Sequence, residues 1–290
     1  MFLLKARLPL LPLLAAGLLM PMGAACAGEA KHKRTAELTV SHQTRSSIAV
    51  EAQNGAIEIA ADSDATAVTI VAQIRAETQE RADAVVISAE RAADGGLIVE
   101  AIWPDKRRNA EGCSFEIIVP DAHGVTATTG NGAIEIAGLS GAAKLTTSNG
   151  AVSVMGHAGE VSANTSNGRI EIESAAGAVQ AKTSNGRIEI EGAAGPVSAK
   201  TSNGSVSLEL APGGVGPVDL STSNGSIEFE FAPGFVGVLK MSTSMGKIEF
   251  TDANGRTVTQ KDRFEIEIGS GGPVCTLTTS MGSISVEVAD

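Results

Sequence analysis

Short runs of alternating apolar and polar residues fill most of this chain, and each run is typical of a β-strand with one buried face. In the stretch 197–210, apolar residues and threonine alternate with polar residues on both sides of Asn203-Gly204. Asn and Gly are the residues that tight corners favour, because both tolerate backbone conformations that other residues avoid. Each such unit therefore predicts two short strands joined by a corner, with one apolar face and one polar face.

The unit recurs with a fixed period. Successive Asn-Gly corners lie 18 residues apart between residues 131 and 204, and later corners follow at 21 and 36 residues. Self-similarity at a short fixed period indicates stacked repeats. The corners are Asn131-Gly132, Asn149-Gly150, Asn167-Gly168, Asn185-Gly186, Asn203-Gly204, Asn224-Gly225, Met245-Gly246 and Met281-Gly282. We predict an all-β fold, a parallel β-solenoid of about 18-residue, two-strand rungs over residues 125–290.

Laid over one another, the units place like residues in columns. One column holds apolar residues and another holds only threonine, as expected when each rung hydrogen-bonds to the next about 4.8 Å away. A chain of antiparallel hairpins would also use Asn-Gly, but it gives no reason for a constant period. Ile266 and Ile268 fall in phase and predict one degenerate rung between Met245 and Met281. The two methionine corners predict a corner geometry of their own.

Residues 28–124 show strand alternation without a period, and we interpret them as a β-rich N-terminal region that caps the solenoid. Asn54-Gly55 predicts a turn between two of these strands. The stretch 76–84 is rich in Ala, Glu, Gln and Arg and predicts one short helix.

Residues 1–27 have the pattern of a secretory signal peptide, with a basic start, a short apolar run and a small-residue cleavage pattern. The chain is therefore expected to be exported, to the periplasm, the outer membrane or the cell exterior. Cys26 leaves a second route open, because acylation of that cysteine would make the protein a lipoprotein. We expect membrane association only if Cys26 is lipidated. The formal net charge of −11 argues against a nucleic-acid partner.

Cys113 and Cys275 remain after processing. An even pair of cysteines in an oxidising compartment is compatible with a disulfide. Two buried free thiols, packing as small apolar side chains, are the alternative. Both interpretations stay open at this point.

Candidate chemistry is sparse. The sequence holds no metal-binding, nucleophile-elbow, phosphate-loop or dinucleotide motif, so we predict no catalytic, metal or cofactor-binding residues and no cofactor. Columns of Glu with Arg or Lys beside them are interpreted as a solvated, partly neutralised face, although a ladder of carboxylates could also bind divalent cations. Trp103, Lys106, Arg107 and Arg108 form a candidate binding loop, with a plain hairpin connection as the alternative.

The strand Ile117-Ile118-Val119-Pro120, followed by the iterated Thr-Ser-Asn-Gly-x-Ile-Glu-Ile unit, resembles the bacterial putative-adhesin family of β-strand repeat proteins of unknown function. The resemblance implies a β-solenoid, an envelope location and a binding role, with an unknown protein or glycan of the cell envelope as partner. We expect a non-enzymatic binding or structural module. The alternatives are a carbohydrate-active enzyme that works in a groove beside Trp103 and Arg107, and a structural assembly subunit.

Overall fold

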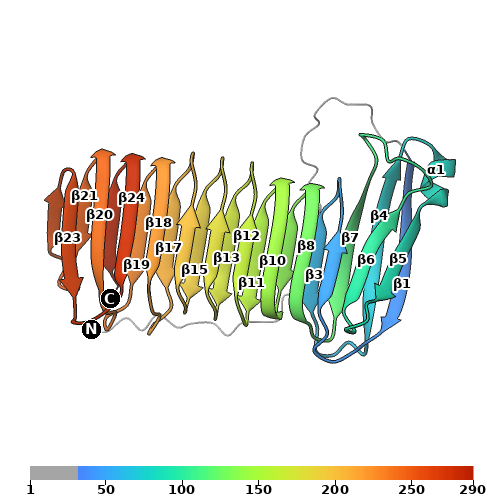
Figure 1. Cartoon of the computed structure of the whole chain (residues 1–290), viewed down its shortest axis with the longest axis horizontal. Helices are drawn as coiled ribbons and strands as arrows, with labels where there is room; N and C mark the ends of the chain where they lie inside the picture. Colours follow the sequence, from blue (N-terminus) through green and yellow to red (C-terminus); the bar gives the residue numbers. More distant parts are fainter. Residues whose placement is uncertain (1–31, 290) are drawn as a thin grey trace, which may run out of the picture.

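The structure is a computed structural model that describes residues 32–289. Two long sheets, of 13 and 12 strands, lie face to face and form a flattened solenoid whose axis runs across the strands (Figure 1). The single helix among these residues, α1 (Gln79–Ala84), lies at one end within the predicted stretch 76–84, and Thr78 caps it by accepting a hydrogen bond from the Arg81 N–H. No helix in the described range 32–289 is long and apolar enough to span a membrane.

The 13-stranded sheet is called sheet A here and the 12-stranded sheet is called sheet B. Sheet A runs, in spatial order, β1 (His32–Ser41), β4 (Ala67–Ala76), β7 (Gly112–Val119), β3 (Ile57–Ala61), β9 (Ile134–Ala137), β11 (Val152–His157), β13 (Ile170–Ala175), β15 (Ile188–Ala193), β17 (Val206–Leu210), β19 (Ile227–Phe231), β25 (Ile284–Val288), β21 (Ile248–Thr251) and β22 (Thr257–Gln260). Sheet B runs β5 (Val86–Arg91), β6 (Leu97–Ile102), β2 (Ile48–Glu51), β8 (His123–Asn131), β10 (Ser140–Asn149), β12 (Val161–Asn164), β14 (Val179–Lys182), β16 (Val197–Lys200), β18 (Val218–Asn224), β24 (Val274–Met281), β20 (Gly237–Met245) and β23 (Arg263–Ile268).

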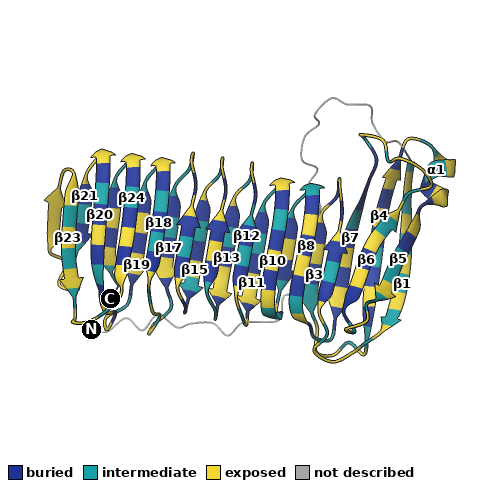
Figure 2. Cartoon of the chain, in the orientation of Figure 1, coloured by how far each residue is buried: buried dark blue, intermediate teal, exposed yellow. Residues whose placement is uncertain are grey.

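Neighbouring rungs pair in parallel and in register, so like residues stack. In sheet A, Ile170 lies beside Ile188, and in sheet B, Val179 lies beside Val197. The inward residues of each strand are buried between the sheets, while the outward residues face solvent, which gives the striped pattern of Figure 2. The predicted parallel β-solenoid is confirmed.

The corners explain the threonine and glycine columns. The Thr183 hydroxyl donates a hydrogen bond to the Gly168 carbonyl of the neighbouring rung at 3.0 Å, and Thr165 does the same to Gly150. A Cβ added to Gly186 would lie 1.9 Å from the Gly168 oxygen, so successive corners approach too closely for any side chain. The Asn side chains form an exposed ladder in which each Nδ2 donates to the previous Oδ1, as Asn185 does to Asn167 at 2.9 Å.

The solenoid begins earlier than predicted, so a boundary between residues 124 and 125 does not describe the fold. β2 and β3 form a rung that pairs in parallel with β8 and β9, and Asn131 continues the asparagine ladder onto Asn54. Asn54-Gly55 is therefore a solenoid corner. The chain then runs outward through β4, α1 and β5, and returns through β6 and β7, which stack on the outer side of β2 and β3. This excursion hides the period in the sequence.

The C-terminal end also departs from chain order. The last rung, β24–β25, inserts between β18–β19 and β20–β21. The predicted degenerate rung is wrong: Ile266 and Ile268 belong to β23, which pairs antiparallel with β20 in sheet B, while β22 pairs antiparallel with β21 in sheet A. The two strands therefore form a layer that runs in the reverse direction on the outermost rung. The methionine corners keep the common hydrogen bond, since Thr243 donates to the Gly282 carbonyl at 2.9 Å. A distinct geometry for those corners was therefore a wrong prediction.

Candidate functional site

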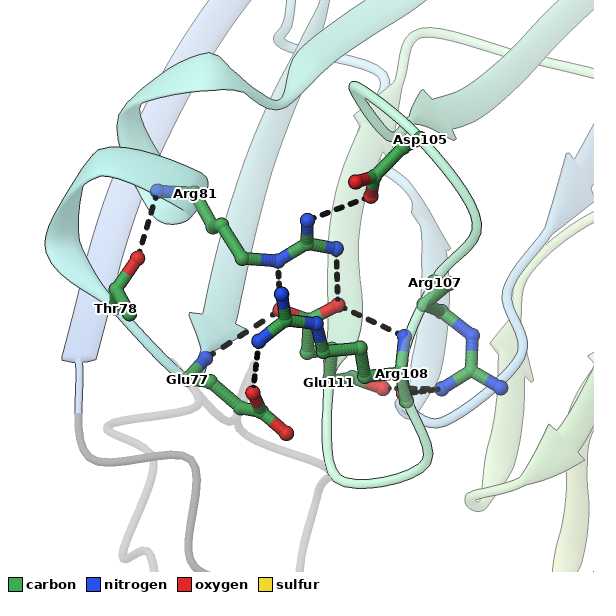
Figure 3. Close-up of polar contacts among 7 residues, drawn as sticks. All are labelled: Glu77, Thr78, Arg81, Asp105, Arg107, Arg108 and Glu111. Carbon is green, nitrogen blue, oxygen red and sulfur yellow. Dashed lines mark hydrogen bonds and ion pairs between the residues drawn. The ribbon is translucent and has the colours of Figure 1, made fainter.

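A buried carboxylate organises the loop after β6, where the sequence predicted a binding loop. Glu111 is fully buried, and the Arg81 guanidinium on α1 holds both of its oxygens, with Nε–Oε1 at 2.6 Å and Nη2–Oε2 at 2.8 Å (Figure 3). The backbone N–H of Arg108 also donates to Oε2 at 2.9 Å. Such bidentate contacts between opposite charges are among the strongest that side chains make. The loop is thereby fastened to α1.

These contacts also set the protonation of the cluster. The hydrogen bonds from Arg81 lower the pKa of the Glu111 carboxyl to about 2, against the opposing effect of its burial. The hydrogen bonds to Glu111 also raise the pKa of Arg81 above its ordinary value. A second acceptor adds to this effect, because Arg81 Nη1 donates to the Asp105 carboxylate at 2.6 Å. Glu111 is therefore ionised at every pH at which the protein is expected to work, and it acts as a structural anchor.

The predicted loop residues mostly turn back onto the protein. Arg107 donates from Nε to the Gln53 side chain at 2.6 Å and from Nη1 to the Glu111 carbonyl at 2.5 Å. Arg108 forms an ion pair with Glu77. Trp103 is half-buried and packs against the core. The chemistry of Trp103, Arg107 and Arg108 is therefore used within the fold, while Lys106 is exposed.

The two cysteines lie in different sheets and near opposite ends of the solenoid, Cys113 in β7 and Cys275 in β24 (Figure 1). Both are buried free thiols. A disulfide between them within one chain is therefore excluded, and the alternative of two buried thiols describes the fold. Burial raises the pKa of the Cys113 thiol to about 12 and also raises that of Cys275. Cys26 and the signal segment 1–27 lie outside the described residues.

The outer face of sheet A carries two parallel columns of Glu. Three members of the first column are neutralised by a basic residue just before their strand: Arg169 pairs with Glu171 at 3.1 Å, Arg187 with Glu189 at 3.4 Å, and Lys247 with Glu249 at 2.8 Å. The second column has no ion pair with any residue between 32 and 289. It contains Glu173, Glu191, Glu209, Glu230 and Glu287, on the consecutive strands β13, β15, β17, β19 and β25.

We call this second column the free Glu row. Glu173 lies beside Glu191, Glu209 beside Glu230, and Glu230 beside Glu287 in the sheet register. Four of its members line a shallow groove of about 310 Å³ together with Ser207 and Glu228. Burial, followed by repulsion from Glu209 and Glu287, raises the pKa of Glu230. Like charges on directly adjacent strands destabilise a sheet, so the free Glu row costs stability.

The outer face of sheet B is chemically different. It presents Lys144, Ser162, Gln180, Ser198 and Asp219 in one column, and small residues such as Ala178 and Pro196 beside them line a shallow groove of about 470 Å³. Lys200 pairs with Asp219 at 2.6 Å. Only the sheet A face therefore holds a continuous row of one charge.

Most of the free Glu row could be identified from the sequence, because each of these residues lies two positions after the place of the first column on the same strand. Glu287 could not be identified in this way, because its place next to Glu230 depends on the insertion of β24–β25. No group of three or more His, Cys, Asp or Glu side chains within residues 32–289 is arranged to hold a metal ion. The row is therefore a linear array of charge, suited to contacts with an extended partner that carries positive groups.

Two solved structures of putative adhesins are similar to this chain. The crystal structure of a putative adhesin from Bacteroides fragilis matches with a TM-score of 0.50 at 14% identity, covering 88% of this chain and 97% of that one. A putative adhesin from Parabacteroides distasonis matches with a TM-score of 0.40 at 13% identity, covering 88% and 97%. A comparison with curated proteins gave no match. The model of the Toastrack DUF4097 family matches residues 23–287. Because the match spans nearly the whole chain, the protein belongs to the Toastrack DUF4097 family, as its resemblance to the putative-adhesin repeat proteins predicted.

Proposed function

We propose that this chain is a non-enzymatic, exported protein of the bacterial cell envelope, an adhesin-like module that binds its partner through the outer face of sheet A. One observation carries the proposal. Five unpaired carboxylates occupy successive rungs of a rigid sheet, although their mutual repulsion opposes folding. A feature that costs stability and has no structural compensation is expected at a functional surface.

The geometry defines the partner's chemistry. The free Glu row crosses successive strands of sheet A, which are spaced about 4.8 Å apart, and four of its members line an open groove. A partner that fits it is extended and carries repeated positive groups, such as a basic protein segment or an amine-bearing glycan of the envelope. The Bacteroides fragilis relative is described as a putative adhesin, which agrees with this role. Export rests on the signal pattern in residues 1–27.

The test compares matched neutralisations. The mature chain is incubated with envelope preparations of the source bacterium, and bound protein is measured at low and high salt. We expect binding that weakens with salt, because exposed charges are screened. The triple variant Glu191→Gln, Glu209→Gln, Glu230→Gln removes three charges of the row and should lose most of that binding.

The control variant removes three exposed charges elsewhere, through Glu37→Gln, Glu51→Gln and Glu90→Gln. It should bind as the unmodified chain does. Equal binding by both triple variants would remove the sheet A face from the proposal, and a wild-type chain that binds no envelope component would overturn the proposal itself.

A further inference from the structure

The terminal strands of the two sheets are protected at the N-terminal end of the solenoid but not at the C-terminal end. At the N-terminal end, α1 packs against β1 and β4, and the Arg34 guanidinium on β1 donates to the Ala82 and Val85 carbonyls at 3.0 and 2.8 Å. Arg91 on β5 donates to the Ser41 carbonyl at 2.6 Å and thereby ties the edge of sheet B to β1. Both sheet edges at this end are fastened by a helix or by charged side chains, a common protection against pairing with other chains.

No helix or tie of this kind within residues 32–289 covers the C-terminal end. Its last layer consists of β22, which pairs with β21 at the edge of sheet A, and β23, which pairs with β20 at the edge of sheet B, and neither strand has a further pairing partner among the described residues. All four residues of β22 are exposed, Val258 is 42% exposed, and the inward side chains Phe264, Ile266 and Ile268 of β23 are half-buried. Figure 2 shows this end with more exposed surface than the middle rungs. The C-terminal end therefore combines two sheet edges whose backbone groups are unpaired with an apolar interior that is only partly covered.

The charges at this end fit a second copy of the same chain. Residues 252–268 hold three basic and four acidic side chains, so this layer is close to neutral although the whole chain carries −11. An antiparallel pairing of β23 with itself, centred on Glu265, keeps apolar side chains on the inner face and places Phe264 opposite Ile266. On the outer face it places Arg263 of each copy opposite Glu267 of the other. Lys240 already neutralises Glu265 at 3.3 Å.

We propose that two copies associate tail to tail through β22 and β23, so that sheets A and B each continue from one copy into the other. This inference goes beyond the proposed function and does not depend on it. The two-fold axis of such a pair is perpendicular to the sheets, which brings the two sheet A faces to the same side. The dimer would carry two free Glu rows on one surface, and a long partner could engage both at once, with a gain in avidity.

The first test is the mass of the mature chain in solution, measured by sedimentation equilibrium over a range of concentrations. We expect a monomer–dimer equilibrium. Val258→Glu places a charge in the paired layer and should weaken dimerisation at least about tenfold. Val86→Glu is the matched control, because Val86 is 59% exposed at the opposite end, and it should leave dimerisation unchanged.

The second test uses charge reversal. Arg263→Glu and Glu267→Arg should each weaken the dimer, because each single change puts like charges opposite one another. The double variant restores opposite charges and should recover dimerisation. Far-UV circular dichroism and thermal melting confirm that each variant is folded. A chain that stays monomeric at the highest concentration, a dimer that survives Val258→Glu, or a double variant without recovery would overturn the proposal.

Discussion

Replacing a single corner threonine by valine should destabilise the solenoid by an amount that the structure sets. Thr183 is buried, and its hydroxyl donates to the Gly168 carbonyl at 3.0 Å. Valine keeps the shape and the β-branched character of threonine, so the substitution removes the hydrogen bond and little else. A hydrogen bond contributes about 0.5–1.5 kcal/mol net, and a stranded buried carbonyl costs about 1–3 kcal/mol.

We therefore expect Thr183→Val to lower the free energy of unfolding by about 1–2 kcal/mol, which corresponds to a fall in Tm of about 2–8 °C for a chain of this size. Because Thr147 and Thr165 make the same contact at 3.0 Å, their valine variants should cost the same within about 0.5 kcal/mol. Thr146→Val is the control: Thr146 lies one residue from Thr147 but faces outward, so it should change stability by less than about 0.5 kcal/mol.

Urea unfolding followed by circular dichroism measures these differences. If Thr183→Val lowered stability no more than Thr146→Val, the buried hydroxyl would contribute nothing to the fold. Widely different losses for the three buried variants would contradict the equivalence of the corners that the repeat predicts.

Three further predictions concern single groups. His157 is buried and donates from Nε2 to the Gly141 carbonyl at 2.8 Å, and burial lowers its pKa; the folded state therefore binds fewer protons than the unfolded state, and stability should fall as pH drops below about 6.5. His157→Leu should remove that dependence in urea titrations at several pH values, and an unchanged pH profile would contradict the assignment. The pKa of Glu111 is lowered to about 2, so its contribution is present above about 4.5 and is lost as pH falls towards 2; Glu111→Gln should lower Tm at pH 7 and flatten the acid limb of the stability curve, whereas an unaltered acid limb would refute its anchoring role. Cys113 and Cys275 should react with a thiol reagent only after unfolding, and intact mass without reductant should show two free thiols; protection of both thiols in the unfolded chain would indicate a disulfide.

The repeat could be predicted because its causes are local. Alternation fixes which side chains face inward, and the constant interval between Asn203 and its predecessors sets one rung beside the next. The order of the rungs could not be predicted, because any rung offers the same apolar columns to its neighbours. β24–β25 fits between two rungs as well as it would fit after them, and only the completed fold distinguishes the two positions.

The candidate sites likewise contain one part that local sequence predicts and one part that depends on the completed fold. The free Glu row follows from phase along the repeat, except for Glu287, whose neighbour depends on rung order. The predicted binding loop was interpreted from composition alone, since three basic residues in an acidic chain suggest a ligand. In the structure Arg108 pairs with Glu77, and Glu111 at the end of the loop pairs with Arg81. Each pair joins residues about 30 positions apart in the chain, and no local pattern reveals such an ion-pair network.

The most direct test of the account is to ask which broad face touches the partner. A photo-crosslinking residue is placed at Ser207, in the groove of the free Glu row, or at Ser198, on the outer face of sheet B. After illumination with envelope preparations, covalent adducts are identified by mass spectrometry. The account predicts adducts from Ser207, weakened by high salt, and background levels from Ser198. Adducts from Ser198 alone would contradict it.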